Sequence, residues 1–423
     1  MTYKKLDAYR VYLAMAAISA FAFGMATTNI VVYFVQTIKM VPLQLVLMGT
    51  AQEAAAFIFE IPTGIVADYY SRRLSVIIGQ FLIGASFLLM GALPSFVAIL
   101  GAQFIMGLGN TFISGALDAW IADELGVDNL GRVFARANQA GTIGWLAGIV
   151  ASSALALIWL PLSILVAGAL FVVLGLALAM FMPEQKFKPA RREQLEQRNG
   201  RALWHGLTST FMQAVRLIRG SPLLIMLMMS SLVFGSFSEG LDRLWEVHLL
   251  NDIGFPVFQP VVWFGVIAIV AKLLDLLVME FVRRRVDMSA RANTGRALLV
   301  SEGLMAAGVV AFALAPGFLI AMISQWFVSV MRNVSGPVFG TWLNQNINSE
   351  VRATALSMSG QSNALGQTMG GPAIGAIGTL FSVRTALVVS ALLLTPALAL
   401  YARTARRKVP APAQVEVEPA ISQ

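Results

Sequence analysis

The sequence predicts an all-α membrane protein with twelve transmembrane helices arranged as two pseudo-symmetric six-helix bundles. Hydrophobic residues make up 57% of the 423 residues and charged residues only 12%, whereas a soluble globular chain carries about 25% charged residues. Apolar stretches of about 20 residues, the length that crosses a bilayer, recur along nearly the whole chain. Basic residues gather on one side of the topology that these stretches define.

The apolar stretches predict the helices in order along the chain. The first follows three basic residues, Lys4, Lys5 and Arg10, but it is long and has no small-residue cleavage site, so we expect a retained helix rather than a signal peptide. The expected spans are 11–38, 43–67, 74–93, 96–122, 133–157, 162–182, 222–249, 257–282, 295–314, 318–346, 353–380 and 384–402.

The distribution of basic residues predicts the orientation. Of the 30 lysines and arginines, only Lys39 and Arg384 fall in the loops opposite the termini, while Arg243, Lys272 and Arg332 fall inside spans. Basic loops stay in the cytoplasm, so both termini are expected there, in the cell membrane. The net charge of +8 is therefore a topology signal, and it does not indicate nucleic-acid binding.

One long connection divides the chain. Residues 1–182 are expected to form the N-terminal bundle and 222–402 the C-terminal bundle, with 183–221 as a cytoplasmic linker that holds an amphipathic interfacial helix and 403–423 as a disordered tail. A weak repeat supports this division. A shift of 222 residues aligns three pairs, Gln103 with Gln325, Trp120 with Trp342, and Gly144 with Gly366. Parallel repeats of this kind place a substrate site between the halves near the bilayer midplane.

The loop between the second and third spans carries a recognisable motif. Gly64, Asp68 and the basic pair Arg72-Arg73 resemble the signature of the major facilitator superfamily, although Tyr69 stands where the family usually has a basic residue. The topology is similar to that family over essentially the whole chain. The resemblance implies a secondary transporter.

A second pattern resembles one subfamily. Gly366, Gly370, Gly371-Pro372 and Gly375 are similar to a glycine- and proline-rich pattern of the family's antiporters, which usually lies on the fifth helix. Gln103 stands where many proton antiporters have an arginine. The chain is most similar to the twelve-helix drug–proton antiporter (multidrug efflux) type.

The loop motif also has a physical interpretation. Gly64 lets the second and eleventh helices approach closely, Asp68 can accept from the amides that begin the eleventh helix, and Arg72, beside Arg73, can pair with Asp118. The resemblance implies that this cluster latches the cytoplasmic side shut. The alternative is that both arginines only anchor the loop.

Ionisable residues inside the spans are candidates for proton coupling. Each costs roughly 3 kcal/mol at the centre of an isolated helix, so several together indicate a wet cavity or pairing. Glu53 lies mid-helix with no basic residue within a turn, and desolvation favours its neutral form, so it can carry a proton. Asp242 is the second candidate. Glu239 is the third, with an ion pair to Arg243 as its structural alternative.

Polar residues on several spans predict a path between the halves. Arg332 either binds an anionic substrate group or neutralises a nearby acid, and we favour the second. Three other glutamates have structural explanations. Glu246 and Glu302 lie near span ends, where water can solvate them. Glu60 can compensate for the helical hydrogen bond that Pro62 cannot donate. The candidates for the substrate cavity are Asn29, Asn138, Gln139, Arg332, Gln361 and Asn363.

These features favour a monomeric, proton-coupled exporter of small amphipathic compounds, with the proton gradient as its energy source. An importer or symporter of a polar metabolite is the alternative, since a fold does not fix direction. An intramembrane enzyme is remote because HExxH, GxSxG and nucleotide-binding motifs are absent. Zero cysteines and two histidines predict no metal site, and we expect no cofactor.

Overall fold

The N-terminal half consists of six membrane-length helical segments. The computed structural model describes residues 7–188, 222–285, 291–346 and 349–406. The first segment runs through α1, the short α2 and the π-turn η1, and the fourth is broken between α5 and α6. The elements are α1 (Ala8–Thr27), α2 (Ile30–Val32), η1 (Tyr33–Thr37), α3 (Pro42–Tyr69), α4 (Arg72–Ala92), α5 (Phe96–Ile113), α6 (Ala116–Leu125), η2 (Val127–Asn129), α7 (Leu130–Ile158) and α8 (Leu162–Phe181).

The C-terminal half repeats this arrangement. Its first segment, α11, ends in the π-turn η3, and its last segment is divided between α16 and α17. The elements are α11 (Pro222–His248), η3 (Leu249–Ile253), α12 (Pro260–Arg285), α13 (Arg291–Ala313), α14 (Phe318–Asn346), α15 (Ser349–Leu380), α16 (Val383–Leu393) and α17 (Thr395–Arg406). No strand occurs in the described ranges, so the predicted all-α membrane fold is confirmed.

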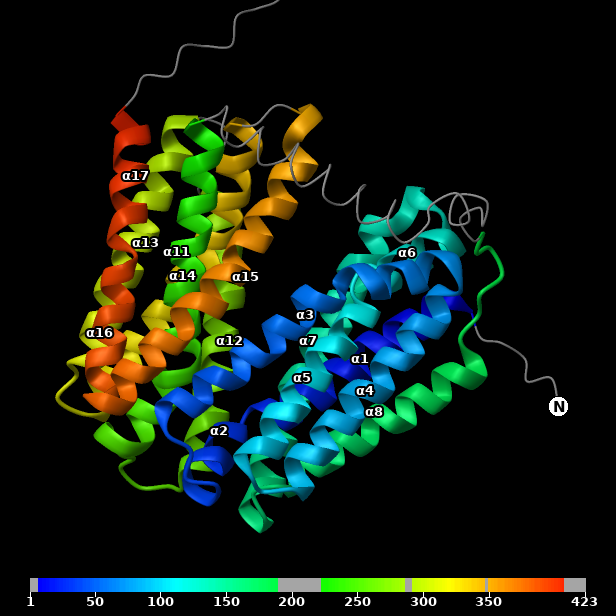
Figure 1. The fold of residues 1–423 in the computed structure, drawn as a ribbon, viewed down its shortest axis with the longest axis horizontal. Coiled ribbons are helices and arrows are strands. Elements are labelled where there is room, and N and C mark those ends of the chain that lie inside the picture. The colour runs from blue at the N-terminus through cyan, green and yellow to red at the C-terminus, as the bar shows by residue number, and fades with distance from the viewer. Residues whose placement is uncertain (1–6, 189–221, 286–290, 347–348, 407–423) are drawn as a thin grey trace, which may run out of the picture.

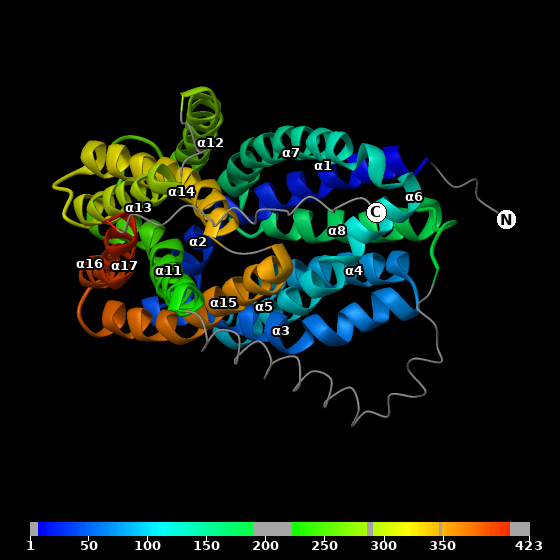
Figure 2. The same cartoon turned by 90° about the horizontal axis from the view of Figure 1, so that it is seen from above.

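Eleven helical segments of the described chain are long and apolar enough to cross a membrane. The remaining predicted span corresponds to α15, which has 32 residues and enough length to cross. Serines, glutamines, asparagines and glycines lower its hydropathy. A helix with such a polar composition needs protein or water around it rather than lipid. In Figures 1 and 2, α15 lies on the face of the C-terminal bundle that meets α3 of the N-terminal bundle.

The two bundles diverge toward one side of the molecule. We call this the terminal side, because α1 begins there and α17 ends there, and we call the opposite side the far side. In Figure 1 the N-terminal bundle leans away from the upright C-terminal bundle, and the separation between the ribbons grows toward the terminal side. Figure 2 shows α3 beside α15 along one edge of the molecule and α7 near α12 along the other.

Contacts between the bundles hold the far side together. The backbone N–H of Leu43 at the start of α3 donates to the Thr379 hydroxyl at the end of α15 over 2.9 Å. Glycines allow this approach. A β-carbon at Gly375 would come within 3.0 Å of Leu43 and 3.1 Å of Val46, and one at Gly371 within 3.0 Å of Val46. On the other edge, Ser153 of α7 donates to the Val261 carbonyl of α12 over 3.0 Å.

The same two helices separate at the terminal side. Among the described residues, no atom outside the neighbouring turns of α3 lies within 4 Å of the position that a β-carbon would take at Gly64. The close approach of the second and eleventh helices predicted at this glycine is therefore not present in this conformation. The structure has the far side closed and the terminal side parted.

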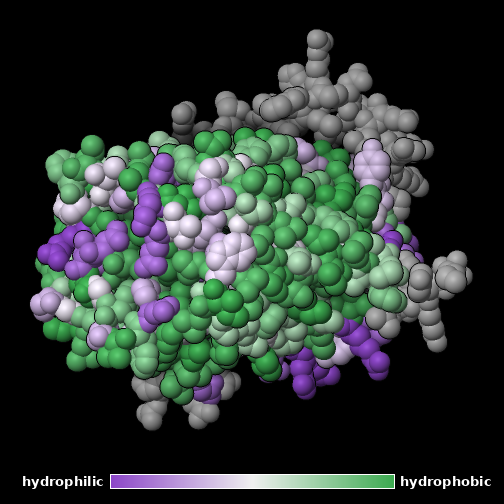
Figure 3. All heavy atoms as spheres, turned by 90° about the horizontal axis from the view of Figure 1, so that it is seen from below, coloured by the Kyte–Doolittle hydropathy of each residue, from purple (hydrophilic) through white to green (hydrophobic). Residues whose placement is uncertain are grey.

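Apolar residues cover most of the face of the molecule that lies on the far side. Figure 3 shows this face, with hydrophilic residues in limited patches. The predicted linker helix and most of the predicted tail lie outside the described residues, which end at 188 within the linker and at 406 within the tail.

A pair of cysteines should lock the far side closed. The wild-type chain has no cysteine, and the 2.9 Å hydrogen bond keeps Leu43 and Thr379 near the Cα spacing of about 4.4–6.8 Å that a disulfide needs. In Leu43→Cys/Thr379→Cys we expect oxidation to join the two halves of a chain cut at a protease site in 183–221, and to stop transport until reduction.

The matched control is Gly64→Cys/Ser357→Cys on the same two helices, where α3 and α15 have parted. We expect this pair to stay unlinked under conditions that join the first. The described arrangement is wrong if the control pair links readily and the far-side pair does not.

Candidate functional site

The charged residues of α11 form two ion pairs near the interface of the bundles. The Arg243 Nε donates to Glu239 Oε1 over 3.0 Å, one turn apart on α11. The Asp242 carboxylate accepts hydrogen bonds from Nη1 and Nη2 of Arg332 on α14, the second over 2.7 Å. The predicted Glu239–Arg243 pair is present. Arg332 neutralises an acid, which is the interpretation that the sequence favoured.

The Glu239–Arg243 pair is packed against the other bundle. Glu239 is only 3% exposed. It lies so close to α3 that a β-carbon at Gly49 would overlap its carboxylate and come within 2.7 Å of an Arg243 nitrogen. Across α11, a β-carbon at Gly371 of α15 would come within 2.8 Å of the Glu239 side chain. Three helices from two bundles therefore enclose this pair.

Glu53 lies one turn along α3 from Gly49 and faces the same region. It is partly buried, and the charges of Glu239, Arg243 and Glu60 all act on it. No basic group of the described residues comes within 4.0 Å of its carboxylate. A single proton or a cation can neutralise this acid, because the nearest arginine is already engaged with Glu239.

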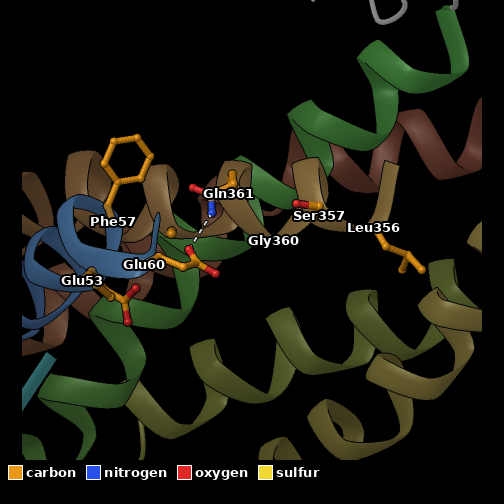
Figure 4. A pocket seen from close by; sticks show the side chains of 9 residues that line it. Glu53, Phe57, Glu60, Leu356, Ser357, Gly360 and Gln361 are labelled. Atoms are coloured by element: carbon orange, nitrogen blue, oxygen red, sulfur yellow. Dashed lines mark hydrogen bonds between the residues drawn. The ribbon is translucent and has the colours of Figure 1, made fainter. Parts of the chain in front are cut away.

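A cavity of about 320 Å³ lies between α3 and α15 beside this cluster. Figure 4 shows Glu53 and Glu60 directed to the same side of α3, with Phe57 turned away from them. Gln361 reaches across from α15, and its Nε2 donates to Glu60 Oε2 over 3.1 Å. The residues lining the cavity are Glu53, Ala56, Phe57, Glu60, Leu356, Ser357, Gly360, Gln361 and Ala364.

The cavity has an excess of negative charge. Two of its nine lining residues are acids and none is basic. Behind it, Glu239 and Asp242 are balanced by Arg243 and Arg332. Charges removed from water need compensation, so this site is suited to taking up protons or cations.

Several predicted cavity residues lie elsewhere. Asn29 is only 1% exposed, and it donates to the Ser152 hydroxyl over 3.2 Å inside the N-terminal bundle. Asn363 turns toward α11, where it donates to the Ser231 carbonyl over 3.4 Å. Asn138 and Gln139 are exposed on α7 and do not line the cavity. Of the six candidates, Gln361 alone lines it.

The predicted latch residues lie at the terminal end of the N-terminal bundle. Arg72 forms its ion pair with Asp123 and donates to the Ala119 carbonyl over 2.8 Å. Asp118, the partner predicted for Arg72, instead accepts from the Tyr12 hydroxyl over 3.5 Å. Both acids lie on α6, and the helical turn between them places Asp123 rather than Asp118 beside Arg72.

The other two members of the motif stay within the same bundle. Asp68 is exposed, and its Oδ1 lies 3.9 Å from Nη2 of Arg72. The backbone N–H of Arg73 donates to Glu184 Oε1 over 2.9 Å. The latch role needs the two bundles to meet at the terminal side, which they do not in this conformation. It stays a prediction.

Three glutamates differ from their predicted environments. The Glu60 side chain accepts a hydrogen bond from Gln361 and does not compensate for the donor missing at Pro62. Near Pro62, the Thr63 hydroxyl donates to the backbone carbonyl of Glu60. Glu302 is 2% exposed inside the C-terminal bundle, with Ser335 donating to it over 3.3 Å. Glu246 is partly buried, and its Oε2 has no hydrogen-bond partner among the described residues. Position near a span end therefore does not predict solvation here.

The comparison that decides the family covers most of the chain. The family model described as Major Facilitator Superfamily matches residues 12–342. The chain belongs to the major facilitator superfamily. A curated relative from Bacillus subtilis (strain 168), the uncharacterized MFS-type transporter YxaM, is 21% identical over 359 residues, which cover 85% of this chain and 86% of the relative.

Solved structures share the fold of this major facilitator protein at low identity. The nucleoside transporter NupG superposes with a TM-score of 0.73 at 14% identity, covering 95% of this chain and all of NupG. A bacterial homologue of the human lysosomal transporter Spinster, solved inward-facing and occupied, gives 0.70 at 15%, covering 96% of this chain and 100% of the homologue. A mutant of the peptide transporter POT superposes with a TM-score of 0.72 at 12% identity, covering 96% of this chain and 97% of that transporter.

Family membership establishes the general activity. The chain is a multi-pass membrane transporter of the major facilitator type, and it is not an enzyme. Transporters of this family carry small molecules. The solved relatives carry different substrates according to their names, so the substrate has to be argued from the site.

Proposed function

We propose that this protein is a proton-coupled exporter of small amphipathic compounds that works by alternating access. The observation that carries the proposal is the position of Glu53, an acid without an ion-pair partner in the described chain, at a cavity between the two bundles. Substrate and proton can meet in that cavity, where Glu53 takes up the proton and binding of the substrate beside it favours release of that proton.

The conformational step follows from the contacts between the bundles. Closure of the far side packs Gly49 of α3 against the Glu239–Arg243 pair and packs α15 against Val46. Opening the far side separates these surfaces and exposes the acidic cavity to the opposite compartment. In this proposal the basic loops place the terminal side on the cytoplasmic face of the cell membrane. The conformation described here is then open to the cytoplasm. One chain contains both bundles, and a monomer suffices.

The terminal-side motif completes the cycle in this proposal. When the far side opens, the terminal ends of α3 and α15 have to meet, which brings Gly64 and Asp68 to α15. Arg72 is already fixed by Asp123 and Ala119, so the loop approaches α15 as a preformed unit. Its role is to hold the outward-open state.

The test uses everted membrane vesicles energised to an acidic interior and monitored with a pH-sensitive dye. Permanently charged lipophilic cations, neutral drugs and polar metabolites are added in turn, with vesicles lacking the protein as the control. An exporter releases protons when its substrate is added. If only a polar metabolite changes the signal, and by moving protons in the same direction as itself, the protein is a symporter and the proposal fails.

A further inference from the structure

The acidic cavity between α3 and α15 carries an inference about the substrate, and this inference rests on the proposed function. We propose that the transported compounds carry an ammonium group, and that this group binds Glu60 by displacing the amide of Gln361. The geometry that points to it is one hydrogen bond of 3.1 Å, which joins a cavity acid of one bundle to a neutral donor of the other.

The charge balance selects a cation. Glu53 and Glu60 are seven residues apart on α3, which places them on one face about 10 Å apart along the helix. Arg243 of α11 and Arg332 of α14 are held by Glu239 and Asp242. An anionic substrate would find no free basic partner among the lining residues, and it would add charge of the same sign.

The neutral donor makes the position of the ammonium group specific. Gln361 offers Glu60 an N–H that carries no net charge, whereas an ammonium group adds the attraction of opposite charges to the same hydrogen bond. An ammonium group therefore competes successfully for the same carboxylate. Glu60 is exposed to the cavity, so the ligand reaches it without rearrangement of the helix.

The displaced contact also lies where the bundles begin to separate. Toward the far side, α3 and α15 touch at Val46 and Gly371, and toward the terminal side no described residue of another helix comes within 4 Å of a β-carbon placed at Gly64. The Glu60–Gln361 hydrogen bond is a bridge between bundles at this boundary. Binding of an ammonium group breaks a link between the two moving halves, which ties substrate recognition to their motion.

The apolar part of the substrate has its own surface. Ala56, Leu356 and Ala364 line the cavity with the acids, and its volume of about 320 Å³ lies at the small end of ligand pockets, which span about 300–1,000 Å³. A compound with one or two aromatic rings and a single ammonium group matches this combination.

The test measures binding to the purified full-length protein in detergent with three compounds of one skeleton. 1-Naphthylmethylammonium, 1-naphthylmethanol and 1-naphthoate differ in charge and hardly in shape. We expect the cation to bind most tightly. Glu60→Gln should weaken its binding at least about tenfold, while Gln361→Ala should strengthen it severalfold, because the competing donor is gone.

Opposite signs for the two variants separate displacement from a general loss of structure, which would weaken binding in both. The control is Asp128→Asn, which removes the same charge from an exposed position outside the cavity and should leave binding unchanged. Equal binding of the alcohol and the ammonium compound, or weaker binding in Gln361→Ala, would overturn the inference.

The outcome stays distinct from that of the proposed function. If a neutral or anionic compound releases protons from vesicles while the ammonium compound does not bind, this inference fails and proton-coupled export stands. If the ammonium compound binds as described, and neither it nor any compound of the vesicle panel is exchanged for protons beyond the control vesicles, the proposed function fails.

Discussion

Glu53→Gln is expected to abolish uphill transport while leaving substrate binding and downhill exchange intact. Glutamine has the shape of the protonated acid but cannot release a proton, so the cycle runs without coupling. One proton moving down a pH difference of one unit supplies about 1.4 kcal/mol, which supports about tenfold accumulation of substrate. Accumulation in vesicles should therefore fall from about tenfold per pH unit to none, measured as substrate content after the pH gradient is imposed.

The control for this variant is Asp128→Asn, which removes the same charge from an exposed site outside the cavity. It should accumulate substrate as the wild type does. If Glu53→Gln still accumulates substrate, the proton is carried by another acid. Glu239 and Asp242 are next, and the corresponding amide variants of these two distinguish them.

Arg243→Met should strongly destabilise the protein. Its guanidinium neutralises Glu239, which is 3% exposed and enclosed by α3, α11 and α15. Removing one partner leaves an uncompensated buried charge, and breaking a buried pair in this way costs about 3 kcal/mol or more. We expect a clear drop in the unfolding midpoint of the purified protein, larger at neutral than at acidic pH, because a protonated Glu239 no longer needs the arginine.

The rescue variant is Arg243→Met/Glu239→Gln, in which the buried charge is removed together with its partner. It should recover most of the lost stability. Arg332→Met is the comparison, since Asp242 is more exposed than Glu239 and water screens its charge, so the loss there is smaller. A double variant as unstable as Arg243→Met would show that the arginine acts by packing rather than by charge.

The sequence predicted the helices closely, because the physics that defines them is local. A run of apolar residues of bilayer length has to satisfy its backbone internally and therefore forms a helix. The expected 96–122 and 318–346 correspond to Phe96–Leu125 and Phe318–Asn346. Glu239 and Arg243 were also paired correctly, since they lie one turn apart on one helix.

Contacts between distant helices were not predictable in the same way. Nothing local relates Glu60 to Gln361, which are 301 residues apart, or Asp242 to Arg332, which are 90 apart. The expected partner of Arg72 was wrong for a related reason, because Asp118 and Asp123 both lie on α6 and only packing decides between them. Asn29 was assigned to the cavity from its polarity, although it serves a buried hydrogen bond.

One available signal for the cavity was the face shared by Glu53 and Glu60 on α3. The polar composition of α15 adds to this signal. Together they indicate a polar interface between one helix of each half of the repeat. Its small lining residues, such as Ala56 and Gly360, carry no polar signature and could not be predicted.

The central claim is that protons and substrate move in opposite directions through one acidic site between the bundles. Its most direct test uses purified protein in sealed liposomes with no initial pH difference and the membrane potential clamped to zero. The compound that gives the largest response in vesicles is supplied on one side, and internal pH is followed with a trapped dye. The account predicts proton flux opposite to the substrate gradient in the wild type and none in Glu53→Gln. Proton flux along the substrate gradient, or equal flux in both proteins, would contradict it.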